Sequence, residues 1–181
     1  MHASVFKKML VISRFEVIFN RETNILCIES KQISVCPFCA GDLVVRDSKK
    51  RGVINSEGEK QVFSLRRLKC KDCNTLHIEL PGFIQPFKHY ASDVIESVLD
   101  ERTDDCPAEE STMKRWQKWF ASILPHIKGA LTAIKMEFFN VNINLLDYAD
   151  IVEYVRSSGA GWLRRLMQML VNSGSRLVAR E

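Results

Sequence analysis

Two pairs of cysteines are the residues of this sequence whose type and spacing are best suited to chemistry. The stretch CPFC supplies Cys36 and Cys39, and CKDC supplies Cys70 and Cys73, with 30 residues between the pairs. Two Cys-x-x-Cys pairs in one short segment are typical of a site where four thiolates hold one metal ion tetrahedrally. Thiolates favour zinc over hard cations, and four protein ligands leave no position for a substrate. The spacing therefore predicts a structural zinc ion.

Other interpretations of the cysteines stay open from the sequence. Each pair could be a redox motif of the thioredoxin type, although that motif needs a strand–turn–helix setting that neither pair has. His77 follows the second pair closely and could compete as a ligand, although four thiolates already complete a tetrahedral site. Cys27 and Cys106 have no partner at ligand spacing, so we expect both to be free thiols.

The elements that would position the cysteines are short strands. DLVVRDS and KQVFSLRRLKC are expected to be strands on either side of a charged loop, KKRGVINSEGEK, and LHIEL is expected to be a third. Upstream, RFEVIF and NILCIE are expected to be two strands joined by a turn at NRETN. A helix over residues 4–19 stays open as an alternative, because short apolar runs are ambiguous.

After Pro86 the pattern becomes helical. Apolar residues recur every three or four positions in 88–101, and a second helix is expected over 111–124 with Ser111 as its N-cap. KGALTAIKMEFF, LLDYADIVEYVR and WLRRLMQMLV predict three more helices. We therefore expect an α+β protein in two domains. A β-rich region (1–85) would contain the zinc ribbon (36–80), and an all-helical, helix-turn-helix-like region would follow (86–181).

Charge is distributed unevenly along the chain. Residues 43–71 carry nine basic side chains against three acidic ones, a local net charge of +6, whereas residues 88–110 carry a local net charge of −6. Such a separation indicates that the basic part meets a polyanion. On a projection of helix 111–124, Lys114, Arg115 and Lys118 lie opposite an apolar, tryptophan-rich side. That arrangement suits the major groove of DNA, but it also fits a solvated amphipathic helix.

CPFCAGDLVVRDS, LRRLKCKDCNTLHIELPGFIQPFKHY and STMKRWQKWF together resemble a family of small bacterial proteins with a transposase-like zinc ribbon and a helix-turn-helix segment. The front end also resembles the zinc-binding N-terminal region of insertion-sequence transposases. The resemblance covers roughly residues 33–124. It implies that Cys36, Cys39, Cys70 and Cys73 bind zinc. It also implies that the following residues face DNA: Thr112, Lys114, Arg115 and Lys118. The segment DERTDDCPAEE departs from the pattern, because it is too short and acidic for a regular middle helix.

No catalytic constellation is evident. The catalytic domain of a transposase needs three well-separated metal-binding carboxylates, and residues 125–181 are too few for it. That segment offers only five acidic residues: Glu137, Asp147, Asp150, Glu153 and Glu181. Three of them, Asp147, Asp150 and Glu153, recur every three residues along a helix, and such a row is typical of a solvated face. No apolar run approaches the roughly 18 residues of a membrane span, and no signal-peptide cleavage site follows the opening segment. We therefore expect a cytoplasmic, nucleoid-associated protein that is not an enzyme and makes no contact with a membrane.

The function expected from these features is binding of double-stranded DNA, as a recognition module without a catalytic domain, from a mobile element or as a transcriptional regulator. A basic strand and loop would hold phosphates through Lys49, Lys50, Arg51, Arg66 and Arg67. The alternative is a zinc-ribbon adaptor whose C-terminal stripe forms a groove for a partner or a second copy: Trp162, Leu163, Leu166, Met167 and Leu170. RNA binding is a third possibility, weakened because the basic strands lack an aromatic platform.

Overall fold

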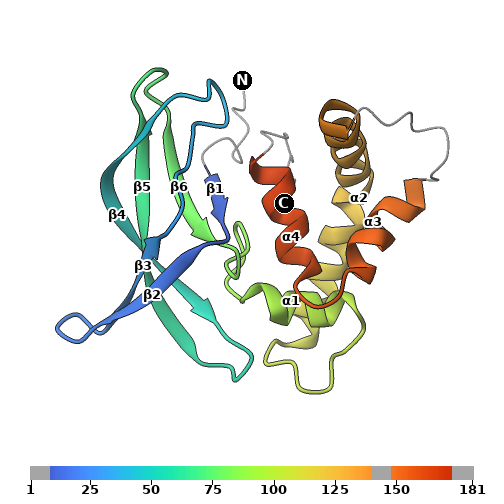
Figure 1. Cartoon of the computed structure of the whole chain (residues 1–181). Coiled ribbons are helices and arrows are strands. Elements are labelled where there is room, and N and C mark those ends of the chain that lie inside the picture. The colour runs from blue at the N-terminus through green and yellow to red at the C-terminus, as the bar shows by residue number, and fades with distance from the viewer. Residues whose placement is uncertain (1–8, 140–147, 173–181) are drawn as a thin grey trace.

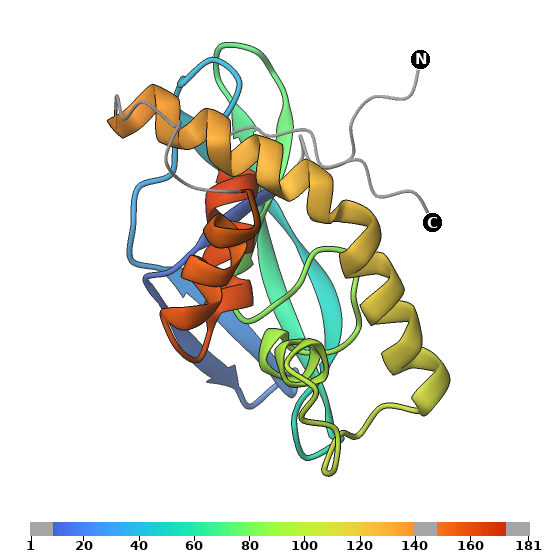
Figure 2. The same cartoon turned by 90° about the vertical axis from the view of Figure 1, so that its right-hand side faces the viewer.

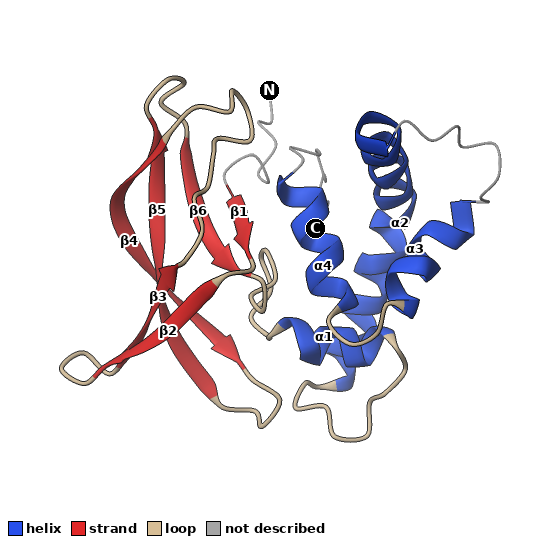
Figure 3. Cartoon of the chain, in the orientation of Figure 1, coloured by secondary structure: helices blue, strands red, loops and turns tan. Residues whose placement is uncertain are grey.

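The computed structural model describes residues 9–139 and 148–172, with the side chains of 132–151 excluded. Strands fill the first part of the described chain and helices the second (Figures 1 and 3). The strands are β1 (Met9–Ile12), β2 (Phe15–Asn20), β3 (Ile25–Ser30), β4 (Leu43–Ile54), β5 (Lys60–Cys70) and β6 (Leu76–Pro81). The helices are α1 (Ser92–Leu99), α2 (Glu110–Phe139), α3 (Tyr148–Ser157) and α4 (Trp162–Asn172).

All six strands belong to one curved sheet that resembles half of a barrel (Figure 1). The central strand is β5. It pairs antiparallel with β4 along one side, and on its other side it pairs with β6 near its end and with β3 near its beginning. Strand β1 extends the sheet beside β6 in parallel, and β2 extends it beside β3 in antiparallel orientation. The long β4–β5 ribbon therefore connects the cysteine-bearing end of the sheet to the opposite end.

One continuous apolar core joins the sheet to the helices. Phe63 and Leu65 of β5, Ile95 of α1 and Trp116 of α2 all belong to this buried cluster, as does every apolar residue of the predicted C-terminal stripe. Strand β1 lies against α4, and all four of its residues are buried. Figure 2 shows α2 running diagonally across the helical side of the molecule. The helices thus cover one face of the sheet.

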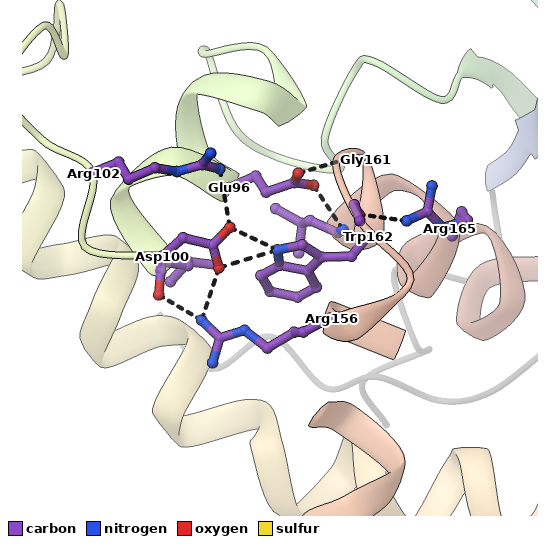
Figure 4. Close-up of polar contacts among 10 residues, drawn as sticks. Glu96, Asp100, Arg102, Arg156, Gly161, Trp162 and Arg165 are labelled. Carbon is purple, nitrogen blue, oxygen red and sulfur yellow. Dashed lines mark hydrogen bonds and ion pairs between the residues drawn. The ribbon is translucent and has the colours of Figure 1, made fainter. Parts of the chain in front are cut away.

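A buried carboxylate fixes the start of α4 against α1 (Figure 4). Glu96, 4% exposed, accepts hydrogen bonds from the backbone N–H groups of Gly161 (2.6 Å) and Leu163 (2.9 Å). Asp100, one turn further along, accepts one from the Trp162 indole N–H and pairs with Arg156. Unpaired N–H groups at a helix start favour a negative charge. The acidic side of α1 therefore serves as a cap for another helix.

The predicted fold, a zinc ribbon followed by a separate helix-turn-helix-like region, is wrong. The strands that carry the cysteines continue into a six-stranded sheet, and the helices pack on that sheet instead of forming their own unit. Helix α2 is also not a short recognition helix, because it runs for 30 residues and continues through Pro125. Its apolar side faces the shared core, which includes Phe120 and Ile127. The local patterns had suggested that the helices form an independent domain. Their apolar sides are instead buried against the sheet, and this burial determines how the helices are arranged.

Two local expectations also change. The charged segment predicted as a loop, residues 49–60, is strand as far as Ile54, and only a tight turn around Gly58 is left between β4 and β5. The alternative helix over residues 4–19 is replaced, from Met9 onward, by β1 and β2; residues 4–8 lie outside the description. Among the residues that the structure describes, no helix combines the length and the apolar character that crossing a bilayer requires.

Candidate metal centre and basic strands

The two cysteine pairs lie on turns of the same geometry. In the first turn the backbone N–H of Cys36 donates to the carbonyl of Gly41 (3.0 Å), and in the second that of Cys70 donates to the carbonyl of Thr75 (2.9 Å). In both turns the residue after the second cysteine has a positive φ: 57° at Ala40 and 59° at Asn74. The left-handed residue reverses the chain, so each turn directs both of its sulfurs to the same side.

The four sulfur atoms converge on one point. The Sγ atoms of Cys36, Cys39, Cys70 and Cys73 all lie within 4.8 Å of one another. Two close separations run between the turns, 3.6 Å from Cys36 to Cys73 and 3.5 Å from Cys39 to Cys70. These distances far exceed a disulfide bond of about 2.05 Å. A redox pair within each motif does not explain this cross-pairing, whereas a metal ion held jointly by both turns does.

The thiols differ in how readily they ionise. Burial raises the pKa of Cys36. A backbone hydrogen bond from Gly41 lowers the pKa of Cys39, but the neighbouring thiols, Cys70 first, outweigh it and raise this pKa to about 12. Two hydrogen bonds with Thr75 lower the pKa of Cys73 to about 6. The bond with the Thr75 hydroxyl has the larger effect, and the bond with the Thr75 backbone has the smaller one. Four clustered thiols therefore cannot all carry charge by themselves, and a bound dication would supply the compensation.

A buried ion pair attaches the first turn to the sheet. Glu79 of β6 is 1% exposed, and its carboxylate contacts Arg66 Nη2 at 2.6 Å and Nε at 2.7 Å. Its other oxygen accepts a hydrogen bond from the hydroxyl of Ser34 (3.1 Å), two residues before the first cysteine. On the same face of β6, the buried His77 places Nε2 3.5 Å from Cys36 Sγ. These contacts hold the metal turn against β5 and β6.

His77 contacts a ligand sulfur and is not part of the four-sulfur cluster. An imidazole N–H directed at a thiolate stabilises its negative charge and orients it. The expectation that four thiolates make up the ligand set agrees with this geometry.

Three arginines predicted to hold phosphates have partners within the protein. Arg66 forms the ion pair with Glu79, and Arg67 pairs with Asp47 across the β4–β5 ladder, which lowers the pKa of that carboxyl. The guanidinium of Arg51 donates to the carbonyls of Gln85 (2.7 Å) and Lys88 (2.9 Å), and burial lowers the pKa of Arg51. These arginines stabilise the sheet and its connection to α1.

Three lysines of the same ribbon are exposed cations. Lys49 and Lys50 lie on β4 and Lys69 lies on β5, and each is exposed to solvent. In the β4–β5 register Lys49 is opposite Leu65 and Lys69 is opposite Val44, so both lysines point to the same face. Lys50, next to Lys49 on an outer strand, points to the other face. The three amines thus lie on both faces of the ribbon, Lys69 beside Cys70 and the other two near the middle of the ribbon.

The cations of α2 lie elsewhere. Lys114 pairs with Glu110 (2.6 Å), Arg115 donates to the hydroxyl of Thr112 (2.7 Å), and Lys118 is exposed. Lys114 and Lys118 point away from the core that Trp116 and Phe120 enter from the same helix. The end of β4 approaches the start of α2, because Ile54 pairs with Tyr90 and the Tyr90 ring packs on Trp116.

The C-terminal region contains the predicted apolar stripe and the acidic residues considered as metal ligands. The stripe proposed as a partner groove is buried, each side chain being 0–2% exposed: Trp162, Leu163, Leu166, Met167 and Leu170. Among the carboxylates, Glu153 is exposed on α3. The remaining four side chains lie outside the described part of the chain: Glu137, Asp147, Asp150 and Glu181.

Several residues that build the site were not singled out from the sequence. Ser34 and Glu79 anchor the metal turn, and Lys69 joins the exposed lysines. Strand alternation offered a signal, because it places Arg66 and Arg67 on opposite faces and Lys69 on the face of Arg67. It could not identify Glu79 as the partner of Arg66, since that contact depends on the pairing of β5 with β6.

Comparison with known proteins gives one match. A family model described as a domain of unknown function (DUF6431) matches residues 36–116, somewhat under half of the chain. The matched segment begins at the first cysteine and ends within α2, so it includes both metal turns, β4 to β6 and α1. Neither the curated proteins nor the solved structures give a match. The chain is therefore similar to this family over the cysteine cluster, the strands β4 to β6, α1 and the start of α2.

Proposed function

We propose that the cysteine cluster binds zinc and that the β4–β5 ribbon, stabilised by this metal, binds double-stranded DNA. The single observation that carries the proposal is a group of exposed lysines on both faces of the ribbon whose end carries the cysteine cluster: Lys49, Lys50 and Lys69.

Sulfur spacing supports zinc as the metal. A tetrahedral zinc ion with Zn–S distances of about 2.3 Å requires sulfur–sulfur separations of about 3.8 Å. The separations of 3.5 and 3.6 Å between the two turns are close to this value and require only a small adjustment. Four thiolates complete the coordination sphere, so the ion would stabilise the turns and would not activate a substrate. We therefore assign the ion no catalytic role.

The shape and charge of the ribbon support DNA as the partner. A two-stranded β-ribbon can enter the major groove, and lysines on both of its faces can contact the phosphates on either side. Since Arg51, Arg66 and Arg67 have partners within the protein, the exposed lysines are better placed than these arginines to contact phosphates and release counterions from the DNA. The resemblance of the cysteine-bearing segment to transposase zinc-binding regions also favours DNA. Such a role would place the protein at the nucleoid.

The test is duplex binding at several salt concentrations, with two matched triple variants. Lys49→Ala/Lys50→Ala/Lys69→Ala removes three charges from the ribbon, and Lys114→Ala/Arg115→Ala/Lys118→Ala removes three from α2. Each lost phosphate contact lowers the slope of log affinity against log salt by about 0.9, so the ribbon variant should lose about 2.7. The helix variant should keep the wild-type slope. Equal effects of the two variants, or no binding by the wild type at about 50 mM salt, would refute the proposal.

A second candidate function, protein binding by the rigid metal turns, is favoured by apolar residues around the cysteines. Ile33 is 96% exposed and Phe38 is 41% exposed, and Val35 and Val45 nearby are also more than half exposed. An apolar patch of this kind is typical of a docking surface. Ile33→Ser/Phe38→Ser would then abolish capture of a partner and leave the DNA slope unchanged, which separates the two functions.

A further inference from the structure

A cavity of about 420 Å³ lies where the sheet meets the starts of α1 and α4. Its apolar lining includes Val53 of β4, Phe63 of β5 and Phe83, which follows β6. The rings of Phe63 and Phe83 pack against each other with their centroids 5.1 Å apart. A volume between about 300 and 1,000 Å³ and a mainly apolar lining with few polar groups are typical of small-molecule sites. The cavity is therefore a candidate binding site.

Two buried polar side chains of the lining are engaged within the protein. Glu96 accepts hydrogen bonds from two backbone N–H groups at the start of α4, one with each carboxylate oxygen (Figure 4). Ser92 donates its hydroxyl proton to the carbonyl of Gly82 (2.9 Å) and accepts a hydrogen bond from the side-chain amide of Gln85 (2.9 Å). These contacts hold the walls of the cavity together, so recognition of a ligand falls to other groups.

Arg164 of α4 lines the same cavity and has no such partner. Among the residues that the structure describes, no hydrogen bond or ion pair holds its guanidinium. Its side chain nevertheless lies against two glycines. A β-carbon on Gly82 would be 2.6 Å from Arg164 Cδ, and one on Gly161 would be 3.2 Å from Nη2.

The two glycines are required for different reasons. Gly161 has a φ of 82°, which a residue with a side chain adopts only with strain. Gly82 is not in this left-handed region, so the close approach of the Arg164 side chain is what requires a glycine there. The fold thus makes room for an arginine beside an apolar cavity without providing an acidic partner for it.

We propose that this cavity binds a small aromatic molecule that carries one carboxylate. The carboxylate pairs with the guanidinium of Arg164, whose planar fork matches two oxygens. The aromatic ring packs against Phe63 and Phe83 in the tilted or offset arrangements that ring pairs favour. Asp93 also lines the cavity and has no partner among the described residues, so a second negative charge on the ligand would be repelled. The cavity is at the end of the β4–β5 ribbon opposite the cysteines, and the proposal does not depend on DNA binding.

The first experiment titrates the metal-loaded full chain with three matched probes and follows the backbone amide signals by two-dimensional NMR. The acid 3-phenylpropionate carries both the ring and the charge, its amide lacks the charge, and propionate lacks the ring. A hydrogen bond to a charged group changes affinity about 10- to 100-fold, so the amide should bind at least about tenfold more weakly than the acid. Propionate should leave the signals of Gly82 and Gly161 unchanged. No response to 3-phenylpropionate at millimolar concentration, or equal binding of acid and amide, would overturn the proposal.

The second experiment measures 3-phenylpropionate affinity in variants. Arg164→Ala removes an exposed side chain, so it should fold normally and bind at least about tenfold more weakly. Arg21→Ala is the matched control, because Arg21 is exposed in the turn of the outward-reaching β2–β3 hairpin (Figure 1). Gly82→Ala keeps the arginine but displaces its side chain, so it should weaken binding in the wild type and have no further effect in an Arg164→Ala background. Wild-type affinity in Arg164→Ala, an equal loss in Arg21→Ala, or the same effect of Gly82→Ala in both backgrounds would refute the assignment.

Discussion

Replacing Arg66 by alanine should destabilise the protein strongly, and replacing its neighbour Arg67 should not. Arg66 holds Glu79, which is 1% exposed and has only the Ser34 hydroxyl as a further hydrogen-bond partner among the described contacts. Removing one member of a fully buried ion pair costs about 3–5 kcal/mol. Because the Arg66 side chain is 31% exposed, water can enter after its removal, and we expect about 2–3 kcal/mol.

The assay is urea unfolding of zinc-saturated protein, so that metal binding does not differ between variants. With a slope of roughly 2 kcal/mol/M, the Arg66→Ala midpoint should fall by about 1–1.5 M. Arg67→Ala is the matched control, because its partner Asp47 is 35% exposed and an exposed pair contributes little.

A double variant completes the test. Arg66→Leu/Glu79→Leu removes both charges and should recover most of the loss, since replacing a buried pair by apolar groups is often neutral. Equal midpoint shifts for the two arginine variants, or a double variant worse than Arg66→Ala alone, would refute the assignment of Arg66 to the fold.

Three further outcomes are expected. Chelation under reducing conditions should release about one equivalent of zinc per chain, because four thiolates complete one site. The helical circular dichroism should largely persist, because the apolar core that holds the helices includes none of the four clustered cysteines. Release of less than half an equivalent from purified protein would count against the zinc assignment. Glu96→Ala should lower the free energy of unfolding by about 1–2 kcal/mol, because it leaves the start of α4 without its cap, whereas the exposed Glu101→Ala should change it little in the same urea titration. The lowered pKa of Asp47 means that its pair with Arg67 stabilises the fold above the ordinary aspartate pKa and that this contribution disappears as the pH falls through the lowered value. Because the pair is partly exposed, the wild type and Asp47→Asn should differ only slightly in urea midpoint at neutral pH and converge at strongly acidic pH.

The sequence identified the cysteine cluster because cysteine spacing is a local signal. A Cys-x-x-Cys turn needs only a few residues to direct both sulfurs to one side, and the two turns of this chain share their backbone geometry. The strands that join the turns were also predictable in part, since alternation and β-branched residues favour strands locally. The extension of β4 to Ile54 was not predictable in this way, because its charged residues are accommodated by pairing with β5.

In the helical half, the local sequence did not reveal which surface the helices pack against. The apolar side of 111–124 was evident, but the surface it packs against belongs to a distant sheet, so an independent helix-turn-helix region was a reasonable and wrong prediction. Patterns of this kind report that a face is buried and do not report the partner.

The roles of individual side chains also divide into those that the sequence shows and those that only tertiary structure decides. The sequence by itself determined that residues 43–71 are basic and that four cysteines occur at metal-ligand spacing. Tertiary structure alone decided that Arg66 neutralises Glu79, that Glu96 caps α4, and that Lys49, Lys50 and Lys69 remain exposed to solvent. The physical reason is that composition sets which charges exist, whereas strand pairing and packing determine which of them lose water and must find partners within the protein.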